Sequence, residues 1–235
     1  GAIDELYEDF NEDYSETGIT VSEGDTLNLG KHTLTFYTAP MVHWPEVMMT
    51  YIPEEKTLFS ADAFGSFGVY HAHPNNWKDE ARRYYVNICG KYGEQVNVAL
   101  RKVHGFDIQT IAPLHGRILD SQQLQEAWRL YETWSDYRPE CSGVLIAHAS
   151  IHGCTAKVAE RIAHHLRNNN VDITLLDLCR TDASEAISQA FKYDKMVLCA
   201  SSYDAGVFPP MYMFLYKLSN KNYQSRRVAL VENGT

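Results

Sequence analysis

The 235-residue chain is short of basic residues and has no long apolar run. Its 21 Lys and Arg residues stand against 30 Asp and Glu residues, so it lacks the positive charge that sequence-independent nucleic-acid binding needs. No stretch approaches the roughly 18 consecutive apolar residues of a membrane span. The N-terminus also lacks the basic-then-apolar layout of a signal peptide. These absences predict a protein that binds neither nucleic acid nor membrane.

Paired cysteines are missing as well. The five cysteines form no Cys-x-x-Cys pair, which argues against a structural zinc knuckle. A sparse, odd count in a chain of this length is typical of a reducing compartment, so we expect a cytoplasmic protein with free thiols. Apolar residues make up 45% of the chain, as in a globular protein of one large or two small domains.

The first part of the sequence alternates β-rich runs with turns and then becomes helical. Its Thr-, Met- and aromatic-rich runs predict strands, and apolar residues three and four apart predict helices. The expected elements are strands over 33–38, 48–52, 57–60 and 108–112, and helices over 78–103, broken near Gly90 and Gly93, and over 121–135.

A polar segment with Pro and Gly over 136–143 is the predicted domain boundary, which gives domains over 1–138 and 139–235. Apolar runs then alternate with amphipathic helices, a pattern that predicts a doubly wound parallel sheet of the α/β class. The expected elements are strands over 144–148, 173–178, 196–200 and 228–231, and helices over 155–166, 183–190 and 211–218.

Two strand-end loops of this second part are candidate ligand sites. The first has hydroxyls and free backbone N–H groups at a strand-to-helix turn, which suits one phosphate, although an ordinary helix cap explains it equally well. The second is a small-residue loop with one aromatic, placed where a planar ring can lie in a doubly wound sheet; a plain turn before Pro209 is the alternative. The predicted contact residues are Ser150, Ile151, His152, Gly153, Cys154 and Thr155 in the first loop, and Ser202, Tyr203, Asp204, Ala205 and Gly206 in the second.

Three strand ends of the first part each carry a candidate metal ligand: His43, Asp62 and His115. Imidazole and carboxylate without thiolate suit iron, zinc or manganese, and a carboxylate can bridge two ions. Each residue alone also has an ordinary explanation, since a strand-end Asp often caps a turn and a His beside Trp44 is often a packed side chain.

The segments around these residues resemble one known family. His43-Trp44-Pro45 and the run 59–65 (FSADAFG) are near-verbatim versions of motifs in the flavodiiron proteins, and segments 78–88 and 111–116 are similar to that family. Its members have a metallo-β-lactamase-like diiron domain followed by a flavodoxin-like domain. The resemblance covers essentially the whole chain and implies that His43, Asp62 and His115 are iron ligands, with Asp62 bridging two iron ions.

Both loops of the second part fit the same resemblance. The spacing of Ser150, Gly153 and Thr155 is similar to an FMN phosphate loop, and the segment 202–206 resembles the family's second flavin loop. Two departures are Ser201, where the family often has Pro, and Cys154, where Ser is usual. Neither change removes a backbone donor, so FMN remains the expected cofactor.

One motif of the family is absent. Its remaining ligands come from a His-x-Glu-x-Asp-His segment that this sequence lacks, and His71-Ala72-His73, followed by Pro74, is the nearest similar run and is interpreted as a loop. We therefore expect a longer parent protein, with a partial metallo-β-lactamase-like αβ/βα domain in this chain and a flavodoxin-like domain cut short at its C-terminal end.

The resemblance implies an oxidoreductase that reduces O₂ to water or NO to nitrous oxide. It also implies a rubredoxin-like or NAD(P)H-linked electron donor and a head-to-tail homodimer. Two alternatives stay open. One is a flavin electron carrier whose metal site no longer turns over. The other is a dinuclear zinc hydrolase of the metallo-β-lactamase class, which leaves the flavodoxin-like half unexplained.

Overall fold

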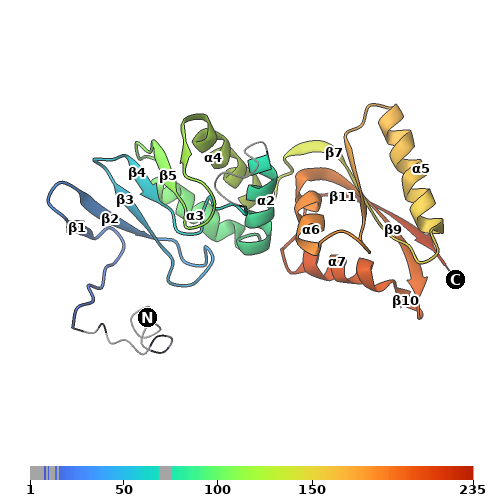
Figure 1. Ribbon diagram of the computed structural model, residues 1–235, viewed down its shortest axis with the longest axis horizontal. Helices are drawn as coiled ribbons and strands as arrows, with labels where there is room; N and C mark the ends of the chain where they lie inside the picture. The colour runs from blue at the N-terminus through green and yellow to red at the C-terminus, as the bar shows by residue number, and fades with distance from the viewer. Residues whose placement is uncertain (1–7, 9, 11–13, 15, 69–75, 235) are drawn as a thin grey trace.

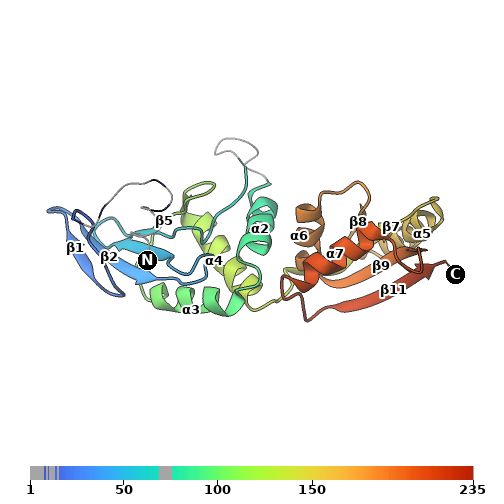
Figure 2. The same ribbon diagram turned by 90° about the horizontal axis from the view of Figure 1, so that it is seen from below.

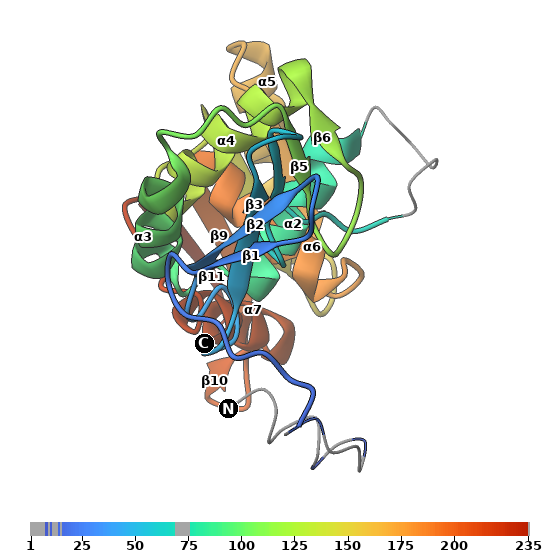
Figure 3. The same ribbon diagram turned by 90° about the vertical axis from the view of Figure 1, so that its left-hand side faces the viewer.

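The computed structural model describes residues 8, 10, 14, 16–68 and 76–234. Two α/β halves lie side by side along the long axis of the molecule, with helix α2 of the first facing helix α6 of the second (Figure 1). Viewed from its end, the molecule presents the first sheet in front of the second (Figure 3). The α/β class and the two-part architecture are therefore confirmed.

The first half is a six-stranded sheet in the order β1-β2-β3-β4-β5-β6, antiparallel except for the parallel pair β4–β5. Its strands are β1 (Thr26–Asn28), β2 (Thr33–Thr38), β3 (Met48–Ile52), β4 (Thr57–Phe59), β5 (Thr110–Ala112) and β6 (Leu119–Asp120). Its helices are α2 (Trp77–Ile88), α3 (Gly93–Val103) and α4 (Ser121–Ser135). The predicted strands and the break between α2 and α3 are confirmed, whereas β1 and β6 were not predicted from the sequence.

The second half is a parallel sheet in which β8, β7, β9 and β11 follow one another. Its strands are β7 (Cys141–Ala149), β8 (Ile173–Asp177), β9 (Tyr193–Tyr203), β10 (Gly206–Val207) and β11 (Arg227–Asn233). Its helices are α5 (Cys154–Asn168), α6 (Ala183–Lys192) and α7 (Pro209–Ser219). Helix α5 covers one face, while α6 and α7 cover the other (Figures 1 and 2).

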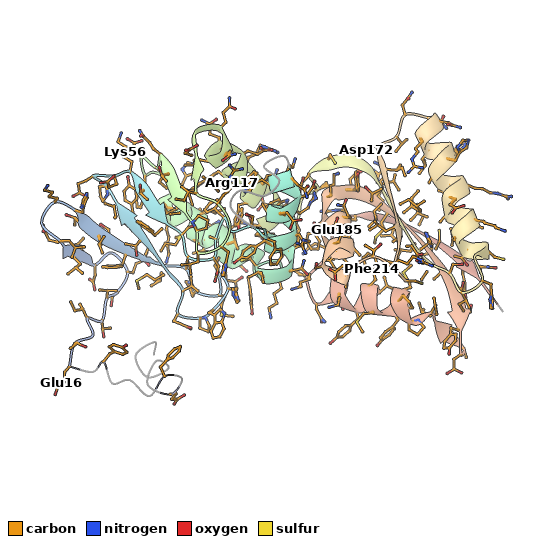
Figure 4. The ribbon with its side chains drawn as sticks, viewed as in Figure 1. Glu16, Lys56, Arg117, Asp172, Glu185 and Phe214 are labelled. Carbon is orange, nitrogen blue, oxygen red and sulfur yellow. The ribbon has the colours of Figure 1, made fainter. Side chains whose placement is uncertain are left out.

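Alternation along β7 explains why both faces are covered. Val144 and Ile146 pack with Ala159 and Ala163 of α5, while Leu145 and Ala147 belong to the core under α6 and α7. Phe214 of α7 projects into that second layer (Figure 4). An apolar strand with neighbours on both sides is what a doubly wound sheet requires.

The second ligand loop differs from the prediction of a small-residue loop that follows a strand ending at residue 200. β9 continues through Tyr203, and the chain turns at Asp204 and Ala205 and pairs back antiparallel as β10. Both turn residues have positive φ, 47° and 55°, as a two-residue hairpin needs. The sequence signal for this turn is weak, because Asp204 suits such a position but Ala205 stands where Gly is usual.

The two halves share one continuous apolar core. Tyr85 and Trp134 of the first half belong to the same buried cluster as Ile187 and Phe191 of α6. The chain crosses from α4 to β7 over residues 136–140, and the domain limits at 138 and 139 stay a prediction. No helix in the described part of the chain has the length and apolarity needed to cross a lipid bilayer.

Candidate metal and flavin sites

The three predicted metal ligands follow strands that run in the same direction. β2 and β4 are each antiparallel to β3, and β4 is parallel to β5, so the carboxyl ends of β2, β4 and β5 share one edge of the sheet. His43, Asp62 and His115 lie in the loops directly after these strands. We call this the His–Asp edge.

Asp62 lies between the two histidines. Its Oδ2 is 3.5 Å from His43 Nε2, and its Oδ1 is 3.4 Å from His115 Nε2. The Asp62 side chain is nearly buried, whereas His115 is mostly exposed. Each carboxylate oxygen therefore faces a different imidazole, an arrangement in which one carboxylate can connect two ions.

Two further side chains contact this group. Tyr84 of α2 donates its hydroxyl hydrogen to Asp62 Oδ1 over 3.1 Å, and its ring lies 5.7 Å from that of His115. Burial, and then the charge of Asp62, raise the pKa of Tyr84, so it stays a donor at neutral pH. Trp44 Nε1 donates to His43 Nε2 over 3.2 Å. Sequence reasoning missed Tyr84, because its helical spacing matches that of a core residue.

The geometry is not that of a closed metal site. Within residues 16–68 and 76–234, no group of three or more His, Cys, Asp or Glu side chains is arranged to hold a metal ion. The imidazoles approach opposite oxygens of Asp62 instead of converging on one point. The donor types nevertheless suit iron. The segment His71–His73 lies outside the described residues, so its interpretation as a loop is not tested.

The first loop of the second half joins β7 to the 15-residue helix α5. Gly153 precedes this helix with φ +83°, and its N–H donates to Ser150 Oγ over 3.1 Å. No acidic residue lies in the first turn of α5. The helix end therefore keeps free N–H groups and an uncompensated partial positive charge, as phosphate binding requires.

Side chains from two other strands meet this loop. The buried Thr155 hydroxyl lies 2.8 Å from Ser201 Oγ at the end of β9, and Asn233 Nδ2 of β11 donates to Thr155 Oγ1 over 3.3 Å. These hydrogen bonds connect the loop after β7 with the carboxyl ends of β9 and β11. We call the group of Thr155, Ser201 and Asn233, with the loop from Ser150, the carboxyl edge. Ser201 and Asn233 were not among the predicted contact residues.

A cavity of about 570 Å³ opens beside the hairpin of the second loop. Three of the predicted contact residues line it, Ser202, Ala205 and Gly206. Its other walls are mainly apolar and include Leu198, Val207, Met211, Leu215 and Leu230. Tyr203 is 53% exposed next to it. A mainly apolar cavity with a few polar atoms in its wall suits a planar aromatic ring.

The two edges lie apart in the molecule. The His–Asp edge contacts α2, which packs against α6 at the junction. β7 begins at the junction and has nine residues, which span about 30 Å at about 3.3 Å per residue. The carboxyl edge is therefore at the far end of the second half, where the chain's C-terminus lies (Figure 1).

Comparison with known proteins agrees with this architecture. Residues 6–116 match the family model described as "ODP family beta lactamase", and residues 145–235 match that of the flavodoxin domain. The rubredoxin:oxygen oxidoreductase of Desulfovibrio gigas superimposes with a TM-score of 0.86 at 24% identity, over 97% of this chain and 59% of that one. A metallo-β-lactamase-like domain followed by a flavodoxin domain is the combination found in the flavodiiron proteins. The chain belongs with them.

Two curated relatives of this flavodiiron chain are 32% identical to it. One is the nitric oxide reductase of Moorella thermoacetica, over 77% of this chain and 45% of the relative. The other is the coenzyme F420H(2) oxidase of Methanothermobacter marburgensis, over 77% of this chain and 47% of the relative. The chain thus spans about half the length of the curated relatives it matches.

Proposed function

We propose that this chain is part of a flavodiiron oxidoreductase that reduces O₂ to water or NO to nitrous oxide. The observation that carries the proposal is that one chain combines the His–Asp edge with the carboxyl edge and its helix-capping glycine loop. The family membership and the names of the relatives support it, since these include a nitric oxide reductase and an oxygen oxidoreductase.

At the His–Asp edge, His43 and His115 would each hold one iron ion, with Asp62 between the two. Iron bound there would supply redox chemistry to a diatomic substrate. The chain's own contribution is orientation. Tyr84 holds one Asp62 oxygen from α2, and the limited exposure of Asp62 keeps bulk water away from the carboxylate.

At the carboxyl edge, FMN would place its phosphate on the N–H groups at the start of α5, from Ser150 to Thr155. Ile151, His152 and Cys154 complete this turn, and the hairpin from Ser202 through Tyr203 and Asp204 to Gly206 would border the ring. Bound FMN supplies one- and two-electron chemistry. The hydrogen bond between the Thr155 and Ser201 hydroxyls, and the one that Asn233 Nδ2 donates to Thr155 Oγ1, keep the strand ends in place for it.

The separation of the two edges supports a head-to-tail homodimer. Because β7 alone carries the carboxyl edge about 30 Å from the junction, the flavin of one copy is too far from its own His–Asp edge. A second copy in reverse orientation brings unlike edges together. Electrons would enter from a rubredoxin-like or NAD(P)H-linked donor in the cytoplasm, where the free cysteines would stay reduced.

Metal analysis combined with a visible absorption spectrum tests the proposal. We expect flavin bands and iron in the complete protein, O₂ or NO consumption, and little iron in this chain alone. Thr155→Val should lose flavin and keep iron, and Asp62→Asn should do the reverse. Thr174→Val, which removes a hydroxyl bonded to Tyr193 in the same half, is the matched control. Zinc without flavin would contradict the proposal and favour the hydrolase.

A flavin electron carrier is the second candidate. It is favoured by the lack, among the described residues, of a side-chain group arranged to hold a metal. Flavin bands and electron transfer without iron in the complete protein would establish it.

A further inference from the structure

Glu140 connects the two halves of the molecule. It is the last residue before β7, and its N–H donates to the Lys192 carbonyl of the second half over 2.9 Å. Its carboxylate points the other way and is buried, 1% exposed, between α2 and α4 of the first half. One residue is thus bonded to both halves.

The carboxylate of Glu140 is held by donors from two helices. Arg82 Nε of α2 and Trp134 Nε1 of α4 donate to its Oε1 over 2.8 Å and 2.9 Å. Lys78 Nζ lies 3.3 Å from its Oε2. Arg82 itself is fully buried, and its Nη1 also donates to Asp79 Oδ1 over 2.8 Å at the outer end of the pair. The Arg82 guanidinium and the Glu140 carboxylate are themselves closed to water, so a displacement that separates them cannot be compensated by hydration in place.

Other polar contacts cross the same junction, and they involve different residues. Arg226 donates to the Tyr137 carbonyl over 2.6 Å and to the Tyr193 carbonyl over 2.7 Å. Arg83 Nη1 donates to Ser184 Oγ over 3.2 Å. The side chains that make these contacts are partly exposed, whereas the Glu140 carboxylate and the Arg82 side chain are buried in the core.

We propose that Glu140 is a positioning residue whose buried pairing with Arg82 fixes the angle between the two halves. The inference rests on the proposed function in one respect. In a head-to-tail pair, that angle sets the gap between the carboxyl edge of one copy and the His–Asp edge of the other. The His–Asp edge belongs to the first half and the carboxyl edge to the second. A change of the angle at the junction therefore alters the distance between unlike edges at both places where the two copies meet.

Domain orientation can be measured without any cofactor. We suggest NMR residual dipolar couplings and small-angle scattering on the whole chain with Glu140→Ala and with the double variant Arg82→Met/Glu140→Leu. The double variant replaces the buried charged pair by apolar side chains of similar volume and is designed to fold. The wild type should give one alignment tensor for both halves, and both variants two. Lys56→Met/Asp107→Leu removes an exposed pair within the first half and should leave one tensor.

Electron transfer gives the second readout, in the complete protein loaded with flavin and iron. The variants should keep flavin and iron content and flavin reduction by dithionite, but reoxidise more slowly with O₂ or NO, by up to about 100-fold. One tensor in the folded double variant would overturn the proposal. Two tensors with an unchanged reoxidation rate would overturn its functional part. If the wild type binds no iron or flavin, the proposed function fails while the tensor result still decides the role of Glu140.

Discussion

Tyr84 and Asp62 are joined by a hydrogen bond of 3.1 Å from the tyrosine hydroxyl to Asp62 Oδ1. The same oxygen lies 3.4 Å from His115 Nε2. Helix α2 thus contacts the His–Asp edge through Tyr84 on one side and the second half through Arg83 on another. A side chain that orients a metal-binding carboxylate affects metal affinity without being a ligand itself.

Removing this hydroxyl with Tyr84→Phe should weaken iron binding to the complete protein by about 10- to 100-fold, because Asp62 loses the donor that orients it. Competition with a chelator measures the affinity. The matched control is Tyr85→Phe, the neighbouring residue, whose buried hydroxyl has no hydrogen-bond partner in the described part of the chain. Equal losses in both variants would show that the effect is one of general stability.

Breaking the buried pair of Arg82 and Glu140 should lower the stability of the protein markedly. We expect Glu140→Ala to lower the free energy of unfolding by about 2 kcal/mol or more, because it leaves the buried Arg82 guanidinium with only the half-exposed carboxylate of Asp79 as a charged partner. Asp107→Ala, which breaks the exposed pair with Lys56, should cost less than about 1 kcal/mol. Urea denaturation gives both numbers. A loss for Glu140→Ala as small as the control's would contradict a tight buried pair.

The stability contributed by the start of α6, at the same junction, should depend on pH. Hydrogen bonds from the Ser184 hydroxyl and N–H lower the pKa of Asp182, whose side chain caps this helix. Because the folded pKa is depressed, the stabilisation is complete at neutral pH and is lost as the pH falls from about 4 through the lowered value.

Asp182→Ala should therefore cost about 1 kcal/mol at pH 7, and its difference from the wild type should shrink as the pH falls below about 4. Unfolding curves between pH 7 and pH 3 measure this. Asp120→Ala is the control, because Asp120 precedes α4 without a side-chain capping bond. A difference for Asp182→Ala that does not change with pH would contradict the capping role.

Cysteine labelling should report on the first loop. Cys154 is exposed at the start of α5, whereas Cys89 is buried, which raises the pKa of its thiol to about 12. We expect a thiol reagent at pH 8 to label Cys154 quickly, and to reach Cys89 and Cys199 only on unfolding. Saturating FMN should slow labelling at Cys154 in proportion to occupancy.

Mass spectrometry of labelled peptides checks this, and Cys154→Ser should remove the FMN-sensitive signal. FMN that binds, as judged from its absorbance, without protecting Cys154 would contradict a phosphate position at the start of α5.

The local elements were predictable because their signals are local. The run from Thr33 to Thr38, the apolar strand after Gly143 and the breaks near Gly90 and Gly93 each express a backbone preference or a periodicity of two or 3.6 residues. The motifs around His43, Asp62 and His115 likewise indicated the family before any distance was known. The short strands β1 and β6 carry no such signal, since they exist only through their pairing with β2 and β5.

By itself, the sequence determined the fold class, the order of the two halves and the residue types at each candidate site. Only the tertiary structure decided that Tyr84 contacts Asp62, that Ser201 and Asn233 meet Thr155, and that Glu140 joins the halves. The physical reason is range. Propensity and periodicity act over a few residues, whereas these contacts join side chains 22 to 78 positions apart, and a buried charge such as Glu140 is satisfied only by partners that folding brings to it.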